Sequence, residues 1–105
     1  MSTQAEIGQA GEAAAVAALK KEGWTITNWD TQAPGSTDIE TSSGNSKLLV
    51  QVKSALAPGS PASLSGDEER NIKSRASRIG ADAYEVRVTL SQALVATGMN
   101  WRKIT

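Results

Sequence analysis

The chain has 105 residues, of which 39% are hydrophobic and 21% charged, a balance typical of one folded domain and not of a disordered segment. Its eleven Lys and Arg residues equal its eleven Asp and Glu residues in number, so net charge argues neither for nor against a nucleic-acid partner. The absence of Cys and His excludes disulfides, thiolate zinc sites, Ser-His-Asp and Cys-His triads, and any site that needs an imidazole.

The first predicted element is a helix in the Ala-rich stretch 4–22. Thr3 and Glu6 form a capping box at its start, and Gly23 is its expected stop. At 100° per residue, Glu12 falls on or beside the apolar face of this helix. A carboxylate in that position needs a partner, because burying an unpaired charge is costly.

A strand is predicted at 24–29, where large apolar and polar residues alternate at period two. Because five positions separate Trp24 and Trp29, regular alternation would point their side chains to opposite faces of the sheet. The Pro-Gly stretch at 33–36 then ends the strand.

The next two strands are predicted at 37–41 and 47–53, on either side of a polar turn at 42–46. Together they form a hairpin. The aperiodic segment 54–65 is long for a loop, which indicates a functional or mobile role.

A second capping box, Ser65 with Glu68, opens a helix over 66–79, and a last strand follows at 83–89. Residues 90–95 could form a further short helix. The element order is therefore α-β-β-β-α-β, which predicts a single α/β domain over 1–105 with a mixed sheet flanked by helices.

Three side chains on this scaffold suit a hard divalent cation, and a lysine is expected beside them. Gln51 and Lys53 share one face of their strand, hairpin pairing can bring Asp38 close to Gln51, and Glu12 could approach from the first helix. Because Mg²⁺ prefers oxygen, the candidate ligands are the side chains of Glu12, Asp38 and Gln51 and the carbonyl oxygen of Val52. Lys53 would stand beside the metal, where it helps to activate the attacking water and offsets charge on the phosphate.

These residues resemble the PD-(D/E)xK nuclease superfamily, in particular the small archaeal Holliday-junction resolvases and the Mrr-like enzymes. The resemblance covers roughly 4–89 and includes the element order, a helix-borne acid, an Asp after a Pro-Gly stretch, and the Gln-Val-Lys run at 51–53. It implies a restriction-endonuclease-like fold in which Asp38 and Gln51 are metal ligands, Lys53 is catalytic and Glu12 is the additional acid of the first helix.

Two positions depart from the superfamily pattern. Pro34 lies four residues before Asp38 instead of directly before it, and Gln51 replaces the usual acid. Gln at this position is similar to the QxK variant of Mrr-like members. It removes one negative charge from the site, which predicts weaker metal binding or greater dependence on Glu12.

The function implied is a cytoplasmic endonuclease that hydrolyses DNA with Mg²⁺ or Mn²⁺, without a membrane segment or signal peptide. A homodimer is expected, because one small domain offers little surface to grip a duplex. The second predicted helix carries four cations that could contact phosphates or form a solvated face: Arg70, Lys73, Arg75 and Arg78.

Each of the site residues also has a purely structural explanation. Gln51 and Lys53 could form the solvated face of a strand, Asp38 could close a turn, and Glu12 could be ion-paired. Two other functions therefore stay open. One is a nuclease fold without catalysis, used for DNA binding or assembly, and the other is an unrelated protein-interaction domain.

Overall fold

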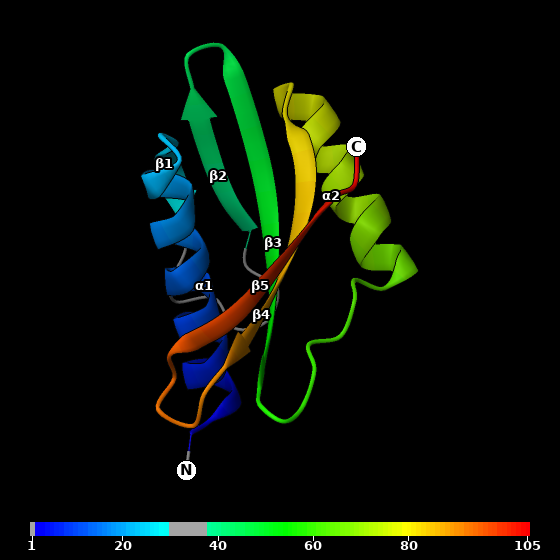
Figure 1. The fold of residues 1–105 in the computed structure, drawn as a ribbon. Coiled ribbons are helices and arrows are strands. Elements are labelled where there is room, and N and C mark those ends of the chain that lie inside the picture. Colours follow the sequence, from blue (N-terminus) through cyan, green and yellow to red (C-terminus); the bar gives the residue numbers. More distant parts are fainter. Residues whose placement is uncertain (1, 30–37) are drawn as a thin grey trace.

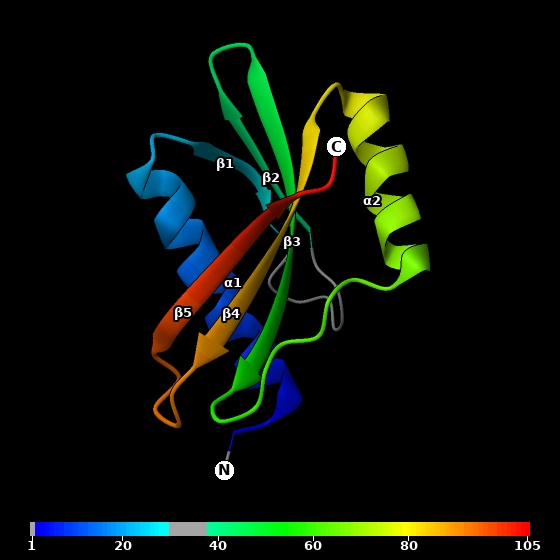
Figure 2. The same ribbon diagram turned by 45° about the vertical axis from the view of Figure 1, so that its right-hand side comes forward.

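The computed structural model describes residues 2–29 and 38–105, with the backbone alone for Asp38. The described residues form a five-stranded mixed sheet with α1 on one face and α2 on the other (Figure 1, Figure 2). Their order is α1 (Gln4–Lys21), β1 (Thr25–Trp29), β2 (Asp38–Ser43), β3 (Ser46–Leu56), α2 (Gly66–Ile79), β4 (Asp82–Leu90) and β5 (Ala96–Lys103). In this part of the chain, neither helix combines the length and apolarity of a membrane span.

Helix α1 begins where the sequence predicts. The Thr3 side chain accepts a hydrogen bond from the Glu6 amide, and the Glu6 carboxylate accepts one from the Thr3 amide, so the capping box is confirmed. Its apolar side covers one face of the sheet and forms the larger core, which contains Ile7, Ala15, Val16, Leu19, Ile39, Val50, Val52, Val86, Val88 and Leu90. We call this side of the sheet the α1 face.

Strand β1 contains a bulge that changes which side its residues face. Its pairing with β2 shifts register between Ile26 and Asn28, which leaves Thr27 as an extra residue. An extra residue reverses the alternation beyond it, so Trp24, Ile26 and Trp29 all pack against the core of the α1 face. The prediction that Trp24 and Trp29 face opposite ways is therefore wrong. The predicted break at 33–36 lies outside the described residues.

The hairpin of β2 and β3 is confirmed, and β3 is longer than predicted because it continues to Leu56. The extension is paired: β3 runs parallel to β4 over nine positions, from Leu48 opposite Asp82 to Leu56 opposite Leu90. The connection before α2 therefore spans 57–65, which is shorter than the predicted loop 54–65.

Helix α2 has the predicted bounds and covers the other side of the sheet, which we call the α2 face. Ser65 and Glu68 make the predicted capping box, and Gly80 ends the helix in the left-handed conformation, at φ 70°. Ile72 and Ala76 form its buried side and belong to a smaller core with Leu49, Leu64 and Ala83.

The C-terminal region forms a hairpin where a short helix was one possibility. The Ser91 amide donates to the Val95 carbonyl and the Leu94 amide to the Ser91 carbonyl, with Leu94 at φ 64°. This tight turn reverses the chain, and β5 pairs antiparallel with β4 at the edge of the sheet. The sheet order is thus β1-β2-β3-β4-β5.

Candidate functional site

A row of polar residues crosses the middle of the sheet. Asp38 of β2 is the backbone partner of Gln51, Gln51 is the partner of Glu85 in β4, and Glu85 is the partner of Arg102 in β5. Gln51 and Glu85 are each 1% exposed, which is unusual for polar side chains in the centre of a sheet. The register confirms that the hairpin brings the backbones of Asp38 and Gln51 together.

Gln51 and Lys53 share one face of β3, as their spacing predicts. This is the α2 face, where both side chains contact Glu68 at the start of α2. The Lys53 Nζ lies 2.6 Å from the Glu68 Oε2, and the Gln51 Nε2 donates to the same oxygen at 3.4 Å. The hydrogen bond from Lys53 is the main reason that the pKa of Glu68 lies below its ordinary value, and the amide of Ser65 adds to the effect. Glu68 is therefore an anion beside the two predicted site residues.

The amide oxygen of Gln51 is buried and, within the described part of the chain, has no hydrogen-bond partner. Most buried polar atoms are satisfied, because desolvating an acceptor without replacing its hydrogen bond costs roughly 1–3 kcal/mol. Since the amide nitrogen is directed to Glu68, the oxygen is left to accept from, or coordinate, another group. This orphaned acceptor in the row of Asp38 fits a cation that prefers oxygen ligands.

Glu12 lies on the α1 face, so the sheet separates it from Gln51 and Lys53. Its Oε1 accepts a hydrogen bond from the Trp29 indole at 3.1 Å, and its residue is 7% exposed. The preceding Gly11 brings α1 against β3, because a Cβ there would lie only 1.7 Å from the Ser54 Oγ. Helix α1 is thus packed against Ser54 and Val52 of β3 at the residue before Glu12.

The pairing of β2 with β3 covers only part of the length of β3. Strand β2 begins at Asp38, opposite Gln51, whereas β3 continues to Leu56. Over residues 52–56, which include the candidate ligand Val52, no strand among the described residues pairs with β3 on that side. The candidate ligand Val52 therefore lies next to the place where the pairing of β2 with β3 ends.

Sequence reasoning missed Glu85, which holds three segments together. Its Oε2 accepts from the Leu64 amide at 2.7 Å and its Oε1 from the Arg102 Nε at 3.1 Å, while Arg102 also pairs with Glu69 of α2. Burial alone would raise the pKa of Glu85, but these hydrogen bonds and the nearby guanidinium charges of Arg102 and Arg87 outweigh it and lower the pKa. No local pattern marks this residue, because its partners lie in other elements.

The lowered pKa values of Glu68 and Glu85 predict destabilisation in acid. The unfolded chain takes up these protons first as pH falls, so the stabilisation is complete above the ordinary value of 4.5 and is lost as pH falls through the folded-state values. Urea unfolding at a series of pH values should give a free energy of unfolding that declines below pH 4.5. Glu85→Gln should make that decline shallower, and an equal decline in both proteins would contradict this account.

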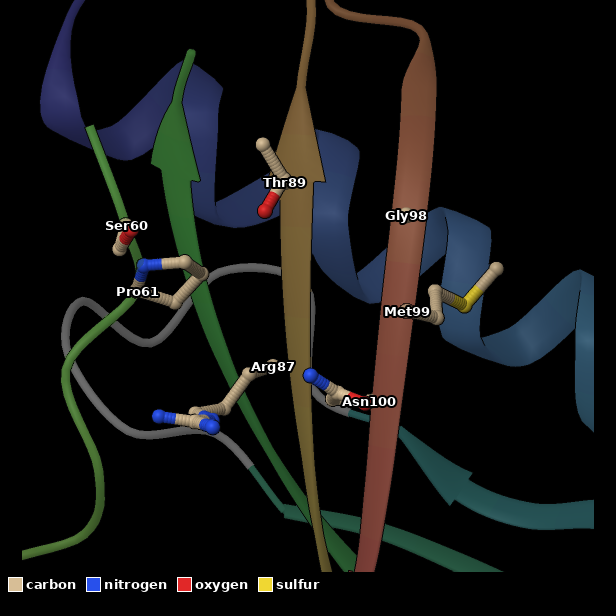
Figure 3. A pocket seen from close by; sticks show the side chains of 7 residues that line it. All are labelled: Ser60, Pro61, Arg87, Thr89, Gly98, Met99 and Asn100. Carbon is tan, nitrogen blue, oxygen red and sulfur yellow. The ribbon is translucent and has the colours of Figure 1, made fainter. Parts of the chain in front are cut away.

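Two hollows lie beside this network on the α2 face. One, of about 380 Å³, is lined by Ser60, Pro61, Arg87, Thr89, Gly98, Met99 and Asn100 (Figure 3). The other, of about 290 Å³, is lined by Ser63, Glu85, Arg87, Asn100, Trp101 and Arg102. Arg87 lines both and extends from β4 toward the segment with Ser60 and Pro61, where its Nη1 donates to the Ser63 Oγ at 3.3 Å. It is also the backbone partner of Lys53, so a basic side chain adjoins the candidate site.

The four predicted phosphate-binding cations of α2 lie away from the sheet. Ile72 and Ala76 take the inner side of the helix, so Lys73 and Arg78 are exposed and Arg75 is half-buried. Arg70 pairs with Asp67 one turn earlier. Burial, and then the charge of Arg78, lower the pKa of Arg75. These cations form a surface separate from Gln51 and Lys53.

The donor set differs from that of an all-carboxylate metal site. Within residues 2–29 and 38–105, no three acidic side chains gather closely enough to hold a metal ion, and the Asp38 carboxylate lies outside this description. Comparison of the chain with protein-family models, with curated proteins and with solved structures finds no significant match. The chemistry of the residues themselves is therefore the basis for a functional assignment.

Proposed function

We propose that this protein is a metal-dependent DNA endonuclease of the restriction-endonuclease-like class. The observation that supports this most strongly is the buried oxygen of Gln51, which has no hydrogen-bond partner among the described residues, is in register with Asp38 and lies two residues before Lys53 on the same face. Helices on both faces of a mixed sheet, with the hairpin before a helical crossover, are consistent with that class. A purely solvated polar strand would not bury Gln51.

The residues of the chain supply binding and charge for hydrolysis. Gln51 and Asp38 are the proposed ligands for Mg²⁺ or Mn²⁺, whereas the predicted ligand Glu12 lies across the sheet from Gln51 and is held there by the Trp29 indole. When bound, this cation would supply a water of lowered pKa and positive charge at the phosphate. Lys53 is the proposed stabiliser of the transition state, because a fixed ammonium offsets the negative charge that develops on the phosphate.

Arg87 is the residue we expect to guide the DNA backbone toward Lys53. The two are backbone partners, and Asn100 of β5 continues the row, so a line of donors crosses three strands that are about 4.8 Å apart. A phosphodiester strand laid along this row would place one phosphate at Lys53 and another over the hollows. The exposed cations of α2 would then be outer contacts of the same duplex, or of the second subunit's DNA in a homodimer.

Arg87→Ala should weaken DNA binding about 10-fold and reduce the slope of log affinity against log salt by about 1, because one phosphate contact is lost. Fluorescence anisotropy with a labelled duplex, in Ca²⁺ or without metal, measures both quantities without cleavage. Arg87→Lys keeps the charge and should retain most of the slope. Unchanged affinity and slope in Arg87→Ala would remove this row from the DNA path.

A DNA-binding or assembly module that lacks catalysis is the second candidate. Two observations favour it. The ion pair with Glu68 neutralises the positive charge of Lys53, and position 51 has Gln in place of an acid. Such a protein would bind DNA with the same salt dependence, but it would bind no divalent cation at Gln51.

A nicking assay separates the two candidates. Supercoiled plasmid and branched DNA are incubated with the protein in Mg²⁺, Mn²⁺ or EDTA, and binding of Mn²⁺ is measured by calorimetry. The nuclease proposal expects cleavage that requires the cation and is abolished by Asp38→Asn. DNA binding without cleavage and without Mn²⁺ binding would assign the non-catalytic module instead.

A further inference from the structure

We propose that Glu68 is a positioning residue of the candidate site, holding Gln51 and Lys53 in the orientation that catalysis requires. This inference rests on the proposed nuclease function, because it concerns the same two side chains. In the sequence, Glu68 is accounted for by the capping box of α2 alone.

The two carboxylate oxygens of Glu68 have separate tasks. The Oε1 accepts from the Ser65 amide at 3.0 Å, and the Ser65 Oγ accepts from the Glu68 amide at 3.1 Å, which ties the side chain to the helix start. The Oε2 points to the sheet and accepts from the Lys53 Nζ and the Gln51 Nε2. The capping interaction anchors one oxygen of the carboxylate. The other oxygen is left to orient the side chains of Gln51 and Lys53.

The hydrogen bond to Glu68 selects one of the two flipped orientations of the Gln51 side-chain amide. With the nitrogen donating to Glu68, the oxygen is left as an acceptor to which no group in the described part of the chain donates. The opposite orientation would set the amide oxygen against a carboxylate oxygen in a buried site, where two acceptors repel each other. Glu68 therefore orients the Gln51 oxygen as a ligand for a cation. A neutral amide depends on such orientation more than a carboxylate does, because either oxygen of a carboxylate can bind a cation.

Lys53 is restrained by the same contact. A Lys side chain on a strand loses much conformational freedom when its ammonium is fixed, and the ion pair keeps this ammonium over the α2 face with the side chain 26% exposed. Catalytic groups that are held close to their working geometry lose less in reaching the transition state.

The first helix provides a natural comparison. Glu6 occupies the equivalent capping-box position of α1, and its contacts are with the Thr3 side chain and amide. A role limited to capping would make Glu6 and Glu68 equivalent. Only Glu68 joins the cap to residues of β3.

Glu68→Gln tests the inference, with Glu6→Gln as the matched capping control. In Glu68→Gln we expect kcat for plasmid nicking to fall about 10- to 100-fold with KM nearly unchanged, whereas Glu6→Gln keeps the wild-type kcat. The side-chain amide signals of Gln51 in ¹⁵N NMR spectra give a second readout that needs no activity. They should move in Glu68→Gln, and their response to added Mg²⁺ should weaken.

The outcomes separate this inference from the function on which it rests. Cleavage by wild type together with an unchanged kcat and unchanged Gln51 signals in Glu68→Gln would overturn the positioning role and leave the nuclease intact. Absence of cleavage by wild type would overturn the nuclease, while the Gln51 signals would still decide whether Glu68 orients that amide. Equal losses of kcat in Glu68→Gln and Glu6→Gln would show that Glu68 acts only as a capping residue of α2.

Discussion

Lys53→Ala is expected to lower the rate of DNA cleavage by about 10²- to 10³-fold, the loss typical when one preorganised charge at a transition state is removed. The ammonium is on the same face of β3 as Gln51, and both side chains are hydrogen-bonded to the Glu68 carboxylate. The binding of Mn²⁺ should persist, because the substitution removes no proposed ligand. Single-turnover nicking and calorimetry measure the two effects separately.

Lys47→Ala is the matched control for this prediction. Lys47 lies on the same strand, is exposed, and donates to the Ile79 carbonyl at the end of α2. It should keep wild-type cleavage. Cleavage by Lys53→Ala at the wild-type rate would show that the Lys53 ammonium does not contribute to catalysis. It would favour a structural role for the Lys53–Glu68 pair.

Glu85→Ala is expected to lower the free energy of unfolding by about 2–3 kcal/mol, the largest stability effect among these polar residues. The substitution leaves the buried Leu64 amide without its acceptor, frees Arg102 from its hydrogen bond, and opens a cavity beneath α2. Because Arg102 is half exposed, solvent screens the loss of its partner, and most of the cost comes from the amide and the cavity. Urea denaturation measures the change.

Asp82→Ala provides the comparison on the same strand. Asp82 is exposed and lies 3.9 Å from the Lys103 Nζ, so its removal should change the free energy of unfolding by less than about 0.5 kcal/mol. Equal effects of the two substitutions would show that the buried network around Glu85 contributes no more than a surface ion pair.

The two large effects concern different parts of one polar row. Lys53 and Gln51 lie where the pairing of β2 with β3 ends, whereas the buried Glu85 carboxylate is bonded to the 57–65 connection and, through Arg102, is linked to α2. Catalysis is therefore expected to depend on the first pair and folding on the second. Glu68 and Glu69, which are neighbours in the first turn of α2, connect the helix to both.

The amino-acid sequence by itself determined the features that depend on a few neighbouring residues. Both capping boxes fix the start of a helix within one turn, and the period-two pattern of β3 fixes Gln51 and Lys53 on one face. The polar turn predicts the hairpin, whereas the register that sets Asp38 opposite Gln51 is known only from the structure.

Only the tertiary structure decided which distant residues meet. The bulge at Thr27 brings Trp29 to the α1 face and so to Glu12, and the parallel register of β3 and β4 sets Glu85 beside Gln51. Glu12 lies across the sheet from Lys53 because α1 and α2 cover opposite faces, which no helical periodicity reveals. Strand register and the choice of face depend on packing summed over whole elements, whereas caps and alternation depend on atoms a few bonds apart.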